Sequence, residues 1–246
     1  ELWFQVARKL LVEDTPDLLA VMFDGTDKIQ HQAWAYLNPE LRPVAPDAAW
    51  TRLRALCLDY FRRLDGYLAE LVRLAGPAVQ VFMASDHGFT ASNRVVRINR
   101  YLADLGHLRY HDIADSDAAR RRAASPFAHL DWQKTVAYCP TPSSNAIHIR
   151  VAREPGQPGI APSDYLAFRA RLIEQLYALP DPISGKPVIQ QVLTREAAFP
   201  GQASADAPDL TLILADYGFV SIRNLEPVVF VRPEAVGTHH PDGIVL

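Results

Sequence analysis

Two short, continuously apolar runs with a long helical pattern between them constrain the fold most. The runs are residues 18–23 and 79–84, and each has the length of a strand. Residues 47–74 carry apolar side chains at the spacing of an amphipathic helix. Because continuous apolar strands are typical of parallel sheets buried on both faces, both runs are predicted to be interior strands. The order of elements predicts an α/β fold, a mainly parallel sheet flanked by helices on both faces.

The remaining periodicity predicts further elements and a division of the chain into three parts. The core is expected at 1–110, an inserted subdomain at 111–208, and a return to the core at 209–246. Residues 111–130 are polar and include Arg120, Arg121 and Arg122, which predicts a mobile loop. Other helices are expected at 2–12, from the loop after Asp24 to Trp34, and at 163–179, and other strands at 135–138, 146–151, 188–193 and 210–214.

Composition excludes several classes of function. The chain has 246 residues and a formal net charge of -3, so bulk charge does not favour nucleic acid or anionic membranes as partners. Its apolar stretches are shorter than a transmembrane span. Cys57 and Cys139 lack metal-ligand spacing, so a disulfide framework is not expected and a reducing compartment such as the cytoplasm is favoured. The first residues lack a Met and a signal-peptide pattern, which is typical of the interior of a longer chain.

The first group of residues with metal-binding chemistry follows the first apolar run. Asp27 and His31 are four positions apart where a loop enters a helix, so both side chains can point at one ion. Active sites of open α/β sheets lie at the carboxyl ends of strands, where this loop is predicted. Taken alone, the spacing also fits a surface ion pair.

Two more groups have the same character. Asp86 and His87 come directly after the second apolar run and precede Gly88, which permits a tight turn. His239 and His240 lie in a loop bounded by glycine and proline. Turn capping and a flexible polar loop are the structural alternatives. Together, carboxylate and imidazole ligands at three loops suit Zn²⁺, or Mn²⁺, better than Mg²⁺ or Ca²⁺.

These groups resemble the alkaline phosphatase superfamily, in its branch of type I phosphodiesterases and nucleotide pyrophosphatases. Residues 23–34 resemble its Asp-x-x-x-His segment, 85–89 its Ser-Asp-His-Gly segment, and 237–243 its Gly-x-His segment. The resemblance continues through further runs at 97–102, 131–138 and 207–210.

The resemblance implies two divalent metal ions, Zn²⁺ first and Mn²⁺ second, and the residues that hold them. Asp27, His31 and His239 would hold one ion, and Asp86 with His87 would hold the other. In the family, the second ion also takes an earlier Asp and a nucleophilic Thr or Ser. No residue before Asp27 resembles that nucleophile motif, so the catalytic nucleophile is expected outside this chain and the isolated chain is expected to be inactive.

The implied activity is metal-dependent hydrolysis of a small phosphorylated substrate, at a phosphodiester or nucleotide pyrophosphate bond. A phosphomutase or sulfatase on the same scaffold, and a metal-stabilised interaction domain without catalysis, are the alternatives. Asp24, Asn93 and His240 are weaker candidates for supporting a ligand or facing substrate. The histidines without a ligand-spaced partner are predicted to be structural or exposed, namely His107, His111, His129 and His148.

Overall fold

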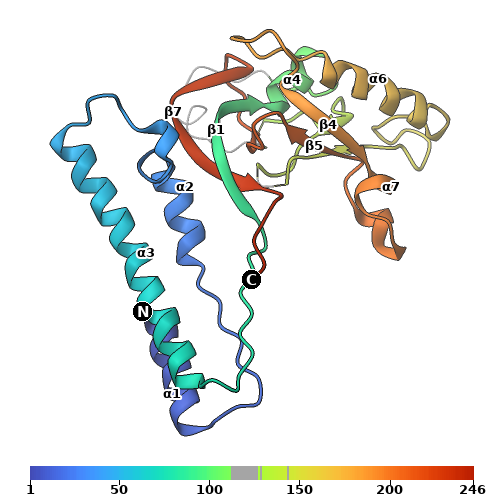
Figure 1. Ribbon diagram of the computed structural model, residues 1–246. Coiled ribbons are helices and arrows are strands. Elements are labelled where there is room, and N and C mark those ends of the chain that lie inside the picture. The colour runs from blue at the N-terminus through green and yellow to red at the C-terminus, as the bar shows by residue number, and fades with distance from the viewer. Residues whose placement is uncertain (112–126, 128, 143) are drawn as a thin grey trace. The chain divides into compact units, whose positions relative to one another are not determined.

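The computed structural model describes residues 1–111, 127, 129–142 and 144–246 (Figure 1). The chain forms two compact units. The helical unit consists of Glu1–Ser92 with Glu234–Leu246, and the sheet unit consists of Asn93–Pro233. Among the described residues, no helix is long and apolar enough to cross a membrane. The predicted mobile loop, including Arg120, Arg121 and Arg122, lies outside the described residues except at its ends.

Three helices build most of the helical unit. They are α1 (Leu2–Glu13), α2 (Gly25–Leu37) and α3 (Ala48–Ala75), with the 3-10 turn η1 (Pro39–Leu41) between the last two. Both α1 and α2 pack against α3 (Figure 1). The α3 helix begins where the Asp47 carboxylate accepts a hydrogen bond from the Trp50 amide, 2.7 Å away. It ends at Gly76, whose φ of 87° suits glycine. The helices predicted at 2–12 and 47–74 are confirmed.

The prediction of an interior strand at residues 18–23 is wrong. Residues 18–23 are extended but belong to no strand, and Leu18 and Met22 are 85% and 79% exposed. Among backbone groups of the described residues, none pairs with this run. An apolar run needs a neighbouring strand and a covering layer before it can become an interior strand, and the run alone specifies neither.

The second predicted interior strand, 79–84, is also wrong. Phe82 is 80% exposed, and the run makes a single isolated bridge, from Ala84 to Val245. Hydrogen bonds between Met83 and Leu246 extend this antiparallel contact by a few residues. The segment therefore makes a short antiparallel contact with residues 244–246 and belongs to neither sheet.

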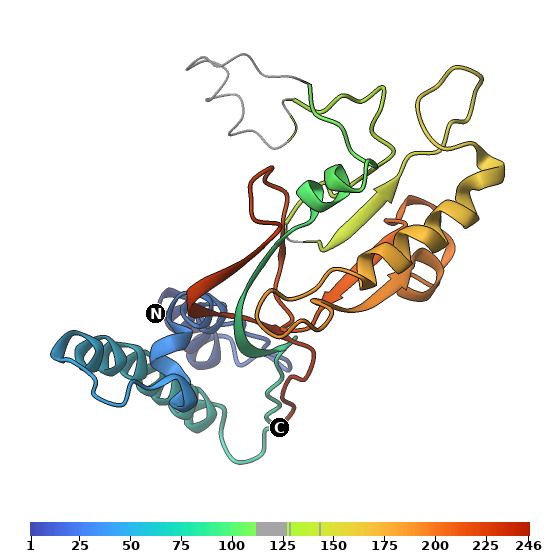
Figure 2. The ribbon, with the colours of Figure 1, turned by 90° about the horizontal axis from the view of Figure 1, so that it is seen from above.

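The sheet unit contains an antiparallel sheet with helices against it. The order is β2–β3–β5–β4, and each neighbouring pair is antiparallel. Helix α6 packs on β4 (Figure 2). A second sheet has the order β6–β1–β7, with β1 and β6 parallel. The elements are β1 (Gly88–Arg97), α4 (Ile98–Asp104), β2 (Ala137–Tyr138), β3 (Ala146–Ile149), η2 (Pro162–Asp164), α6 (Tyr165–Tyr177), β4 (Ile189–Thr194), α7 (Arg195–Ala198), η3 (Gln202–Asp206), β5 (Leu210–Leu214), β6 (Val220–Ser221) and β7 (Val229–His240).

These sheets confirm a mixed α/β fold with helices flanking sheets. They differ from the prediction in strand direction, since the four-stranded sheet is antiparallel throughout and not mainly parallel. Antiparallel neighbours need no helical crossover between them. The strand predicted at 210–214 is confirmed in full as β5. The compact units divide at 92/93 and 233/234, whereas the domain boundaries predicted from the sequence are 110/111 and 208/209. That domain organisation stays a prediction.

Candidate metal centre

Helix α2 carries two of the predicted ligands on one face. Asp27 lies in its first turn and His31 one turn later. The Nε2 atom of His31 is 3.3 Å from Oδ1 of Asp27. The Nδ1 atom of His31 is 2.9 Å from the carbonyl oxygen of Gly237. Because a carbonyl only accepts, Nδ1 carries the proton and donates it, which leaves the lone pair of His31 on Nε2, facing Asp27.

Strand β7 brings His239 to the same place. Its Nε2 atom is 3.0 Å from Oδ1 of Asp27 and 2.9 Å from Nε2 of His31. The close approach of β7 to α2 depends on Gly237, since a Cβ there would lie 2.2 Å from the carbonyl oxygen of Gln30. A side chain at position 237 would therefore push the strand away from the helix and separate His239 from Asp27.

The spacing of these three atoms suits one small cation. Ligand atoms around a tetrahedral Zn²⁺ lie roughly 3–3.5 Å apart, given metal–ligand distances of about 2.0–2.2 Å. The three separations among Asp27, His31 and His239 are 2.9, 3.0 and 3.3 Å. Two imidazole nitrogens 2.9 Å apart have to share a proton or a cation, because two lone pairs repel. The donor set therefore fits a divalent ion bound by one carboxylate and neutral imidazoles.

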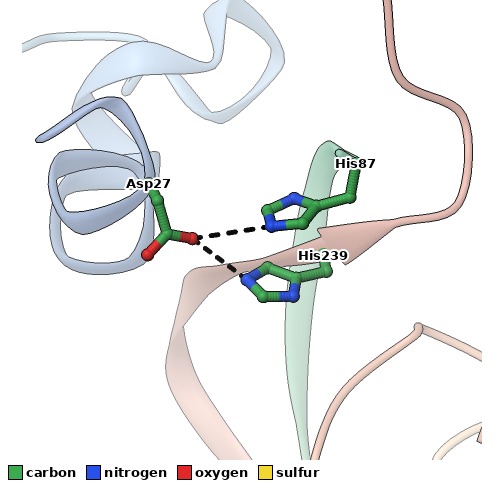
Figure 3. A group of neighbouring side chains, drawn as sticks. All are labelled: Asp27, His87 and His239. Atoms are coloured by element: carbon green, nitrogen blue, oxygen red, sulfur yellow. Dashed lines mark hydrogen bonds and ion pairs between the residues drawn. The ribbon is translucent and has the colours of Figure 1, made fainter. Parts of the chain in front are cut away.

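His87 joins the same group from the start of β1. Its ring stacks on that of His239, with centroids 3.6 Å apart, and Figure 3 shows both rings facing Asp27. The Nε2 atom of His87 is 3.9 Å from Oδ1 of Asp27. Ligand atoms of Asp27, His87 and His239 all lie within 4.8 Å of one another. The Nδ1 atom of His87 is 3.1 Å from the carbonyl oxygen of Gly88, which again places the lone pair on Nε2.

Asp86 stands at the margin of this group. Its side chain is 90% exposed, and its Oδ2 atom is 3.6 Å from Nε2 of His87. Two residues later, Gly88 begins β1 close to the backbone of Asp242, since a Cβ on residue 88 would lie 2.1 Å from the carbonyl oxygen of Asp242. The structure therefore brings Asp27, His31, His87 and His239 together and leaves Asp86 mostly in solvent.

The electrostatics of the group favour the forms that bind a metal. Burial raises the pKa of Asp27, but hydrogen bonds from Lys28 and His239 and the nearby His31 outweigh it and hold that pKa below its ordinary value. Burial lowers the pKa of His239, and His87 and His31 lower it further, against the opposing effect of Asp27. An ionised carboxylate and a neutral imidazole are the protonation states that coordinate a metal.

An aromatic side chain that the sequence did not single out supports the three histidines. The Phe89 ring on β1 lies 5.0 Å from the ring of His31, 5.5 Å from that of His87 and 5.4 Å from that of His239. The ring of Trp34 packs against that of Phe89, with centroids 5.8 Å apart. Phe89 thus limits the rotation of the imidazoles. Its place directly after Asp86-His87-Gly88 was the available signal.

The weaker candidates lie in three different settings. Asp24 is the N-cap residue of α2, and its carboxylate makes no capping hydrogen bond. His240 accepts a hydrogen bond from the amide of Asp242 at Nδ1, 3.2 Å away. Asn93 belongs to the sheet unit, where its amide donates to Asp216 and its side-chain oxygen accepts from Arg94.

Two of the other described histidines, His107 and His148, have structural surroundings. His107 bonds to Gln175 at 2.7 Å and packs edge-on against Phe168. His148 stacks on Tyr138, and burial lowers its pKa. Neither belongs to the group of candidate ligands found among the described residues.

Comparison with known proteins points to one family. The model of the type I phosphodiesterase / nucleotide pyrophosphatase family matches residues 1–242. No curated protein and no solved structure gives a match.

Proposed function

Since the chain belongs to the type I phosphodiesterase / nucleotide pyrophosphatase family, we propose that it carries the metal-binding part of an active site that hydrolyses phosphate esters. The proposed substrate is a small phosphodiester or a nucleotide pyrophosphate. One observation carries the proposal: Asp27, His31 and His239 meet within 3.3 Å although His239 is far away in sequence.

The proposed ion is Zn²⁺, with Mn²⁺ as the second choice. Asp27, His31 and His239 would hold it through one oxygen and two nitrogens. A second ion would be held by His87 with Asp86, which requires the exposed Asp86 carboxylate to turn toward His87. With just these two ligands, the second site would bind its ion more weakly than the first.

Residues of the chain would supply charge to the ions and orient the ligands. When bound, divalent ions stabilise the charge that develops on the oxygens of a phosphoryl group. The Asp27 carboxylate supplies negative charge, and the carbonyls of Gly237 and Gly88 hold His31 and His87 in the tautomer with the lone pair on Nε2. Phe89 keeps the rings in position. The Thr or Ser nucleophile of this mechanism is not assigned to a residue of this chain.

The proposed fold is alkaline-phosphatase-like, with residues 111–208 as a small inserted subdomain. The family assignment supports this arrangement.

Hydrolysis of a chromogenic phosphodiester by the natural gene product tests the proposal. Chelation should abolish hydrolysis, and Zn²⁺ or Mn²⁺ should restore it. His239→Ala should reduce the rate by about a hundredfold or more, because a ligand of a catalytic ion is lost. His148→Ala is the control and should change the rate by less than about twofold, as expected for a residue outside the site. Activity that survives chelation, or equal loss in both variants, would contradict the proposal.

A further inference from the structure

We propose that the sheet unit contains a separate binding site for a small organic anion, in a cavity beside Asp209. The cavity has a volume of about 630 Å³ and is lined by eleven residues, among them Arg150, Arg153, Tyr165 and Arg195. Small-molecule sites commonly have volumes of about 300–1,000 Å³. None of the lining residues is a candidate metal ligand.

One side of the cavity is a fixed polar cluster centred on Asp209, which is 2% exposed. Its Oδ2 accepts a hydrogen bond from the Ile149 amide at 2.6 Å. Its Oδ1 accepts from the Tyr165 hydroxyl and from Nη2 of Arg195, each at 2.6 Å. Because three donors hold this carboxylate, it anchors Arg195 and Tyr165 at the cavity and is not available to repel an incoming anion strongly.

The lining carries more positive than negative charge. Arg195 is the only lining arginine bonded to Asp209 among the described contacts. Arg150 donates to the carbonyl oxygens of Trp132 and Thr135, which carry no net charge. Arg153 is exposed, and no carboxylate pairs with it among the described residues. The lining thus contains three arginines and one carboxylate, that of Asp209, and a surplus of positive charge in a concave site attracts anions.

Part of the lining is apolar. Ile149, Val151, Pro158 and Pro162 supply it. Guanidinium groups recognise phosphate, phosphonate and carboxylate groups through paired N–H donors. An apolar wall next to such groups suits a ligand whose charged head is attached to a compact apolar body. A free inorganic ion would use only part of this cavity.

Calorimetric titration with phenylphosphonate tests the site. The protein is kept in a chelator, so that the candidate metal centre contributes no binding. We expect saturable binding that weakens as salt is added, because the contacts are between charges. Benzyl alcohol, which lacks the charge, should not bind, and inorganic phosphate should bind more weakly than phenylphosphonate.

Two exposed arginines of the sheet unit give a matched pair of variants. Arg153→Ala removes a cavity charge and should weaken phenylphosphonate binding about tenfold, as for loss of a charge-assisted contact. Arg223→Ala removes an exposed arginine outside the cavity and should change binding by less than about twofold. Both side chains are exposed, so both variants should fold. Absence of saturable binding, equal loss in the two variants, or inorganic phosphate binding as tightly as phenylphosphonate would overturn the proposal.

Discussion

The helical unit and the sheet unit differ sharply in how much apolar surface they bury. The buried core cluster runs from Val96 to Val229 and lies entirely in the sheet unit. Among the described residues of the helical unit, Phe4 and Ala7 are the only buried apolar ones. The candidate metal centre belongs to the unit with little core. An ion there would join α2 to β7 and add stability that packing does not provide.

The long helix α3 shows why a regular pattern does not guarantee a core. Its apolar residues have helical spacing, yet Leu53 and Leu56 are 42% and 58% exposed. In the sheet unit, Leu172 and Leu176 on α6 are fully buried against the neighbouring strand layer. Amphipathic spacing forms both helices, but the helices packed on α3 leave Leu53 and Leu56 exposed, whereas Leu172 and Leu176 on α6 are fully covered.

The largest expected difference between the units comes from truncating a leucine in each. Leu172→Ala should lower the free energy of unfolding of the sheet unit by about 2–5 kcal/mol, because it leaves a cavity in a closed core. Leu56→Ala should change stability by less than about 0.5 kcal/mol, because the side chain is already exposed. Native-state hydrogen exchange measures both units separately. Equal effects of the two substitutions would contradict the difference in packing between the two units.

Zinc should stabilise the helical unit more than the sheet unit. At a free Zn²⁺ concentration one hundred times the dissociation constant, linkage predicts about 2.7 kcal/mol of added stability for the unit that binds it. Amides of α2 and of β7 near His239 should gain hydrogen-exchange protection, while those of α6 should not. Uniform protection of both units, or protection confined to the sheet unit, would count against the assignment of the ligands.

The ion pair between Arg94 and Asp181 should add about 1–3 kcal/mol to the free energy of unfolding of the sheet unit. The Asp181 side chain is 9% exposed, and its Oδ2 is 2.5 Å from Nε of Arg94. Arg94→Ala should therefore lower the free energy of unfolding far more than Arg63→Ala does. The second substitution breaks an exposed ion pair with Asp59 in the helical unit. Urea unfolding of the two variants makes the comparison.

The same pair predicts a pH dependence with a definite sign. The Arg94 hydrogen bond holds the pKa of Asp181 well below its ordinary value, with help from the amides of Ser184 and Ile183. A carboxyl group with a depressed pKa stabilises the folded state fully above its unfolded pKa of about 3.9, and this stability is lost as pH falls below that value. The difference between the wild type and Arg94→Ala should therefore be constant above about pH 5 and shrink in acid. A difference that grows in acid would contradict the assignment.

The smallest expected effect concerns the run 79–84. Phe82→Ser removes a ring that is 80% exposed, so the free energy of unfolding should change by less than about 0.5 kcal/mol. A loss of several kcal/mol, measured by urea unfolding, would show that this run is buried in solution.

Local sequence signals predicted local structure well. The helical spacing of residues 47–74 matches α3, and the strand predicted at 210–214 matches β5. The runs 18–23 and 79–84 misled the prediction, because apolar character indicates a tendency to be buried but does not specify a pairing partner. The direction of the strands was missed for the same reason, since pairing is a property of distant segments.

The candidate site was predictable only in part. Asp27 and His31 follow from helical spacing, whereas the arrival of His239 beside them depends on β7 and could be expected only from the family resemblance. The resemblance also led us to expect His87 near these ligands, whereas its ring stacking on His239 and the support from Phe89 and Gly237 required the three-dimensional arrangement. No local rule relates these residues, because the contacts join segments that are distant in the chain.

Calorimetric titration of Zn²⁺ into this chain tests the central claim most directly. Asp27, His31 and His239 are predicted to bind one ion tightly, so His239→Ala should abolish most of the binding heat. His148→Ala replaces a histidine of the sheet unit that stacks on Tyr138, and should leave the titration unchanged. If the two variants titrate alike, the proposed metal centre is wrong.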